Sequence, residues 1–174
     1  MENQNTKEQD SKLQRFFCEQ LQDIYWAERK LLKTLPKLAD AATTSQLKDA
    51  FTNHEQQTRV HVERLERVFA SIGEDAVAKK CPAMSGIVEE GTEIIDETEE
   101  GTAQRDVGLI FAAQKAEHYE IATYGGLVTL AKTLHYDHVA EILAETLEEE
   151  KQADGLLTQI AENDINYQAS QEQE

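Results

Sequence analysis

Two glutamates interrupt what the sequence predicts to be the buried face of a long helix. Glu117 and Glu120 share a stripe, repeating every three or four residues, with apolar and aromatic side chains, namely Ile110, Ala113, Tyr124, Val128 and Ala131. Removing a carboxylate from water costs several kcal/mol unless a partner compensates it. Two carboxylates on adjacent helical turns also repel each other. The pair therefore predicts either a hydrated face or a cation or proton held between the two side chains.

Candidate ligands also occur near the middle of the other long apolar stripes. Glu28, His54 and Glu150 hold these positions, and Asp154 lies one turn beyond Glu150. A helix rises about 1.5 Å per residue, so these side chains can meet at one level of an antiparallel bundle. The pattern therefore predicts a metal site formed by Glu28, His54, Glu117, Glu120, Glu150 and Asp154.

The types of these side chains indicate which metal they would bind. An oxygen-rich set with few histidines suits iron or manganese, and magnesium or calcium less well. Because several carboxylates would need two ions to neutralise them, we expect a di-iron site, with manganese as the alternative. Di-iron bundles place Glu-x-x-His on two helices, but Glu55 has no histidine three residues later. The remaining second-helix ligand could therefore be Gln57, Glu55 or His61. If His61 is not a ligand, we interpret it as a structural or surface residue.

The elements that must position these side chains are long helices. Apolar periodicity and cap residues predict helices over residues 11–42, 45–72, 102–134 and 137–162, with a short amphipathic helix near 84–95. Pro36 predicts a kink or an early end in the first helix. Two short connections and one long one favour two antiparallel pairs joined by a long crossover, an all-α ferritin-like four-helix bundle. We expect residues 1–10 and 165–174 to be disordered around a single domain at 11–164.

Composition narrows the function. The 174-residue chain has a net charge of -17, which disfavours nucleic-acid and membrane partners. It has no apolar run near the roughly 20 residues of a membrane-spanning helix, and its first residues lack the apolar core of a signal peptide. Cys18 and Cys81 have no cysteine partner nearby in sequence, as is typical of a reducing cytoplasm. Any electron donor is expected to be a separate molecule, because no rubredoxin-type cysteine pair is present.

Five segments together resemble a known family. They are DIYWAERKLL (23–32), HEQQT (54–58), CPAMSGIVEEG (81–91), AEHYEIATYGGL (116–127) and ETLEEEKQAD (145–154). They are similar to the bacterial YciF/YciE proteins of the ferritin-like superfamily. The resemblance implies a rubrerythrin-like bundle, a homodimer, a di-iron site at the same six positions and a link to stress responses. One departure is Gln57, where the family often has an acidic residue.

Three functions are compatible with these observations. The first is a stress-response protein whose di-iron or manganese site reduces peroxide or dioxygen, or oxidises ferrous iron. The second is a non-catalytic acidic structural or stress dimer, in which the carboxylates are protonated or bonded to tyrosine and histidine. The third is iron storage in a cage, although nothing in the sequence specifies a shell. Melting with and without ferrous or manganous ion separates the first two, because only metal binding to the folded state raises the melting point.

Overall fold

The computed structural model of this chain describes residues 11–173, and within that range every regular element is a helix. The all-α expectation is therefore confirmed. In chain order the elements are α1 (Lys12–Ala41), α2 (Ser45–Ser71), α3 (Pro82–Glu97), α4 (Ala103–Thr133), α5 (Asp137–Ile160), the π-helix η1 (Ala161–Ile165) and α6 (Asn166–Gln171). The four long helices lie within one or two residues of the predicted ranges. No helix in the described part is long and apolar enough to span a bilayer.

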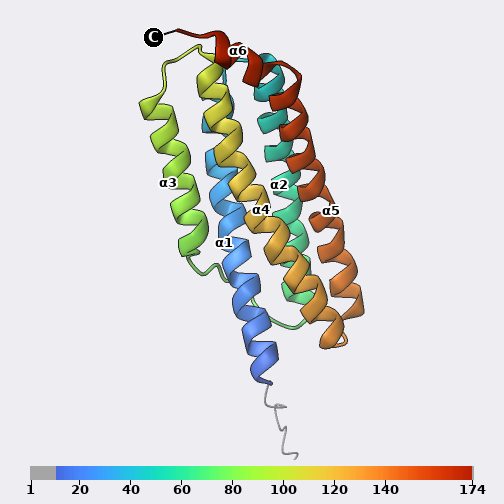
Figure 1. Ribbon diagram of the computed structural model, residues 1–174. Coiled ribbons are helices and arrows are strands. Elements are labelled where there is room, and N and C mark those ends of the chain that lie inside the picture. The colour runs from blue at the N-terminus through green and yellow to red at the C-terminus, as the bar shows by residue number, and fades with distance from the viewer. Residues whose placement is uncertain (1–10, 174) are drawn as a thin grey trace, which may run out of the picture.

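The long helices pack side by side around one core. α1 packs on α2 and α4 on α5, and the two pairs meet through the contacts of α1 with α4 and of α2 with α5. Figure 1 shows α1 and α5 running in one direction and α2 and α4 in the other, with α3 lying along the outside of α1 and α4. The connection through α3 returns the chain to the end where α2 began, so α2 and α4 point the same way. Opposed neighbours bring the middle of all four long helices to one level.

Local sequence signals explain where these helices begin. Ser11 and Gln14 form a reciprocal capping box at the start of α1, and Thr102 accepts a hydrogen bond from the backbone N–H of Arg105 at the start of α4.

A buried carboxylate links the two helix pairs. The fully buried Asp106 accepts hydrogen bonds from the backbone N–H groups of Thr43 at 2.6 Å and Thr44 at 2.9 Å. This carboxylate ties the turn between α1 and α2 to the first turn of α4, and so fixes how the two helix pairs are aligned.

The structure differs from expectation at two helix ends. Of the kink or early end expected at Pro36, the early end is wrong, because α1 continues through this exposed proline to Ala41. The chain from residue 165, expected to be disordered, instead continues into α6. Glu172 then accepts hydrogen bonds from the backbone N–H groups of Ala103 at 2.7 Å and Gln104 at 2.9 Å, which anchors this polar tail on the start of α4. The predicted lead-in, residues 1–10, lies outside the described residues.

Candidate metal centre

Five of the six predicted ligands converge in the interior of the bundle. Glu28 comes from α1, His54 from α2, Glu117 and Glu120 from α4, and Glu150 from α5, and all five side chains are buried. Their exposed fractions are 0% for Glu28, Glu120 and Glu150. Each lies on the apolar face of its helix, so packing that face against the core carries the acidic side chain inside with it.

The first group of ligand atoms joins α2, α4 and α5. One ligand atom each from His54, Glu117, Glu120 and Glu150 lies within 4.8 Å of all the others. His54 Nε2 lies 3.2 Å from Glu117 Oε1 and 3.7 Å from Glu150 Oε2. A single cation could therefore be reached by three carboxylates and one imidazole nitrogen without a change of fold.

The second group joins α1, α2 and α5 and contains the residue that the sequence left open. His61 Nδ1 lies 3.0 Å from Glu150 Oε1 and 3.5 Å from Glu28 Oε1, and the three side chains form a second set within the same 4.8 Å limit. Among histidine and acidic side chains, His61, and not Glu55, is thus the second that α2 brings to the cluster. Glu150 belongs to both groups, with one oxygen facing each histidine.

Two remaining acidic candidates, Asp154 and Glu55, lie outside these groups. Asp154 is 23% exposed, and its Oδ1 lies 3.0 Å from Gln114 Nε2 and 3.3 Å from His118 Nε2. Four residues advance a helix by about 400°, so Asp154 is turned about 40° from Glu150, towards these outer residues of α4. Glu55 instead forms an ion pair with Arg59 on its own helix.

The electrostatics of the cluster follow from crowding several acids in a dry space. Burial raises the pKa of Glu120 well above its usual value, and the carboxylates of Glu150, Glu28 and Glu117 raise it further. Burial also raises the pKa of Glu28 and of Glu150, although His61 opposes the shift in both. The buried carboxylates therefore repel one another, and bound protons or cations would reduce this repulsion.

The two histidines hold protons tightly in this environment. Burial disfavours charged His54, but the neighbouring Glu117 and Glu150 outweigh it and raise the pKa of His54 to about 9. Burial likewise disfavours charged His61, but Glu150 and Glu28 raise the pKa of His61 to about 11. A metal ion that takes an imidazole nitrogen as a ligand must displace such a proton.

The cluster also contains buried carboxylate oxygens without regular hydrogen bonds. Six of them have no hydrogen-bond partner of regular geometry among the described residues: one each on Glu28 and Glu117 and both on Glu120 and Glu150, although the two Glu150 oxygens lie 3.0 Å from His61 and 3.7 Å from His54. Buried polar atoms are normally hydrogen-bonded, so a set of this size in one place indicates a site that binds something. These oxygens and the nearby imidazoles form the oxygen-rich donor set that iron and manganese accept.

Side chains around the cluster fix the orientation of its members. The Tyr124 hydroxyl donates a hydrogen bond to Glu28 Oε1. His61 Nε2 lies 2.8 Å from Glu149 Oε2, and Arg64 holds the same carboxylate through both of its terminal nitrogens. Arg64 and His61 keep the pKa of Glu149 below its usual value. His61 is thereby held between an inner carboxylate and an outer one.

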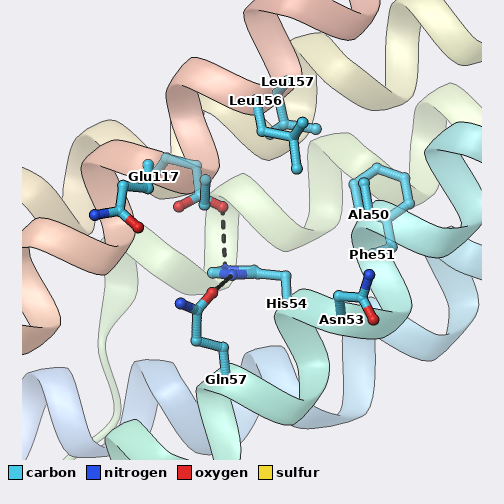
Figure 2. A pocket seen from close by; sticks show the side chains of 10 residues that line it. Ala50, Phe51, Asn53, His54, Gln57, Glu117, Leu156 and Leu157 are labelled. Atoms are coloured by element: carbon cyan, nitrogen blue, oxygen red, sulfur yellow. Dashed lines mark hydrogen bonds and ion pairs between the residues drawn. The ribbon is translucent and has the colours of Figure 1, made fainter.

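A cavity open to the surface reaches the cluster. It lies between α2 and α5 and has a volume of about 200 Å³. Figure 2 shows His54 and Glu117 joined by an ion pair on one side, with Gln57 beside His54 and Leu156 and Leu157 on the neighbouring helix. Gln57 Oε1 lies 3.5 Å from His54 Nδ1. Gln57 therefore lies beside the first group.

Comparison with known proteins gives consistent matches along the chain. Residues 12–170 match the family described as a domain of unknown function, DUF892. Protein YciF of Escherichia coli strain K12 is 46% identical over 154 residues, which are 88% of this chain and 92% of that protein.

Two solved structures share the fold over most of their length. The crystal structure of the E. coli stress protein YciF matches with a TM-score of 0.86 and 44% identity, covering 90% of this chain and 99% of that one. YcfI from Rhodopseudomonas palustris, provisionally described as a structural protein, matches with a TM-score of 0.82 and 34% identity, covering 87% and 96%.

Proposed function

The chain belongs to the DUF892 family, and we propose that its buried cluster is a two-metal centre for iron or manganese that reduces hydrogen peroxide or dioxygen. The observation that carries this proposal is the position of Glu150. Its two oxygens face His54 and His61, so one carboxylate can bridge two ions. Bridging carboxylates of this kind are how helical bundles hold two metals a few ångströms apart.

The donor set fits such a pair. His54, Glu117, Glu120 and Glu150 would hold one ion, and Glu28, His61 and Glu150 the other. Two divalent ions would offset the four carboxylate charges while the two histidines bind as neutral imidazoles. Two ferrous ions, when bound, would supply the two electrons that convert hydrogen peroxide and two protons into two waters.

The surrounding side chains have separate tasks in this proposal. Tyr124 orients Glu28, and Glu149 orients the imidazole of His61 through its outer nitrogen. Glu120 has both oxygens without a protein partner, so it can move between binding and not binding a metal at little cost in hydrogen bonds. The reducing equivalents come from a separate molecule, and ferrous iron itself is an alternative substrate.

Several wider assignments accompany this proposal. The antiparallel pairs and the long crossover through α3 support a place in the ferritin-like superfamily. The similarity to a protein described as a stress protein supports a role in stress responses. We also propose a homodimer in the cytoplasm, where Cys18 and Cys81 would stay reduced.

The direct test is elemental analysis and an optical spectrum of protein purified freshly from iron-rich cells. We expect about two metal ions per chain, because the two groups share one bridge. Wild-type protein that contains no metal, and whose melting point ferrous and manganous ions do not change, would contradict the proposal.

A second function is favoured by one observation, namely that the histidines lie at ion-pair distance from the glutamates. In that case protonated His54 and His61 and a protonated Glu120 would neutralise the cluster, and the protein would serve a structural role. The provisional description of the R. palustris relative is compatible with it. Melting with and without metal separates the two functions, because the ion should not raise the melting point of a cluster that is already neutralised by protons.

A further inference from the structure

The cavity between α2 and α5 forms an opening that ends at the candidate metal centre. Its floor is His54 and Glu117, both members of the first ligand group. Asn53, Gln152 and Leu156 are exposed and form its rim, and Leu156 has 44% of its surface exposed. Figure 2 shows the imidazole of His54 and the carboxylate of Glu117 facing each other within this space.

The lining of this opening is uncharged above its floor. The rim carries the amides of Asn53 and Gln152, and its walls are apolar, formed by Ala50, Phe51, Ala153 and Leu157. In a chain with 34 acidic residues, a route into an acidic centre could easily have been lined with carboxylates. Such groups would raise the local concentration of cations, whereas an amide and apolar lining does not.

Size and charge together define what this opening can admit. A water molecule in the liquid occupies about 30 Å³, so a cavity of about 200 Å³ has room for a few small molecules. Amides can form hydrogen bonds with a small polar molecule such as peroxide, and apolar walls suit dioxygen. An anion would be repelled by Glu117 at the floor and by the net charge of -17.

Among the described residues, a second cavity that reaches the cluster has a smaller volume, and an ion pair covers another side. Beneath α3 an apolar cavity of only about 20 Å³ reaches the same His54 and Glu117. On the side of His61, the ion pair of Arg64 with Glu149 covers the second group. Of these two cavities, the opening between α2 and α5 has the larger volume.

From this geometry we propose that the opening is the route by which a neutral small oxidant reaches the centre, and that Ala153 sets its width. The proposal rests on the two-metal function above and adds the class of molecule admitted and the residues that select it. Ala153 lies on α5 at the wall, where its small side chain keeps the passage open. A larger side chain there would narrow the passage without replacing any ligand.

The test compares Ala153→Leu with a matched control, Ala122→Leu. Ala122 is an exposed residue of α4 that lines a different hollow, beside Phe16 and away from His54. Both variants and the wild type are loaded with ferrous ion, and metal content and melting point are measured first. Nitric oxide, a neutral diatomic, is then mixed with each protein, and the optical change is followed by stopped flow.

We expect equal metal content in all three proteins and nitric oxide binding about tenfold slower in Ala153→Leu alone, equivalent to about 1.4 kcal/mol of added barrier. Leu156→Ala, which removes the exposed rim side chain, should accelerate the same reaction. This second variant keeps the test decisive if Ala153→Leu folds poorly.

Three results would overturn the proposal. The first is an unchanged nitric oxide rate in both Ala153→Leu and Leu156→Ala, and the second is equal slowing in the Ala122→Leu control. The third is an equal slowing of ferrous ion uptake in Ala153→Leu, which would mean that the route does not select neutral molecules. Wild-type protein that takes up no metal would overturn the two-metal function together with this route, and the loading measurement identifies that case separately.

Discussion

Replacing Glu120 by glutamine should stabilise the metal-free protein and reduce the further stabilisation that bound metal provides. Glu120 is fully buried, and burial together with three nearby carboxylates raises its pKa well above the usual value. In the unfolded chain, a glutamate has a pKa of about 4.3 and is ionised at neutral pH. Folding must therefore either bury this charge or bind a proton, and both lower the free energy of unfolding. Glutamine has a similar shape and removes that cost.

The size of the effect has an upper limit at pH 7. One pKa unit corresponds to about 1.36 kcal/mol, and the interval from about 4.3 to 7 then amounts to at most about 3.7 kcal/mol. For a chain of this length, each kcal/mol shifts the melting point by about 2–4 °C. We therefore expect metal-free Glu120→Gln to melt up to about 7–15 °C above the wild type.

The dependence on pH has a definite sign. Below about pH 4.3, Glu120 is protonated in both the folded and the unfolded chain, so the two proteins should differ little. As the pH rises above that value, the unfolded wild type loses its proton while folded Glu120 retains it, and the stability of the wild type falls. The advantage of Glu120→Gln should therefore grow from about pH 4.3 towards neutrality and level off above the raised pKa of folded Glu120.

With metal present the advantage of Glu120→Gln over the wild type should shrink. A ligand at a hundred times its dissociation constant adds about 2.7 kcal/mol to the stability of the folded state. Loss of a Glu120 oxygen should reduce the increment given by ferrous or manganous ion. Differential scanning calorimetry with and without metal measures both effects, and Asp154→Asn, outside the two ligand groups, is the control that should change neither. A lower melting point for metal-free Glu120→Gln at pH 7, or an unchanged metal increment, would refute this reasoning.

Three further predictions follow from individual contacts. Glu117→Ala should abolish metal uptake by the first group, because it removes a ligand of that group and leaves His54 without its nearest carboxylate, and elemental analysis after iron loading should show the loss of about one of the two ions. Below the His54 pKa of about 9, the affinity for manganous ion should rise about tenfold per pH unit for each proton that the ion displaces. Competition titrations between pH 6.5 and 8.5, roughly the range in which the ion stays dissolved, would measure this slope. An affinity independent of pH would exclude His54 as a ligand. Asp106→Ala should lower the free energy of unfolding by about 2–5 kcal/mol, because the N–H groups of Thr43 and Thr44 lose their carboxylate acceptor. Urea unfolding of metal-free protein should detect this loss. A loss below about 1 kcal/mol would contradict the role of Asp106 in aligning the helix pairs.

The sequence predicts the long helices well because their signals are local. Apolar periodicity marks the buried face, and caps such as Ser11 and Thr102 mark where a helix begins, so the predicted ranges differ from α1, α2, α4 and α5 by only one or two residues. The structure of the polar tail was not predicted in this way. Its composition predicts disorder, whereas the acceptor role of Glu172 at the start of α4 is a contact between residues far apart in the chain.

The candidate site divides in the same way. Periodicity identified the five buried ligands because each interrupts an apolar stripe, but it could not decide between Asp154 and His61. Seven residues return a helix to within about 20° of the same direction, whereas four residues miss it by about 40°. The seven-residue spacing of His61 from His54 therefore favours His61 as a ligand. Its angular offset of about 20° is only modestly smaller than the offset of about 40° between Asp154 and Glu150.

By itself, the sequence determined which faces are buried, and thus that carboxylates would be forced into a dry interior at a common depth. Only the tertiary structure decided that Glu150 serves two groups, that His61 completes the second, and that a neutral opening leads to the first. The reason is that helical periodicity specifies a direction around one helix axis. The distances between side chains on different helices depend on how those helices are rotated and aligned, and that follows from packing contacts spread over the whole chain.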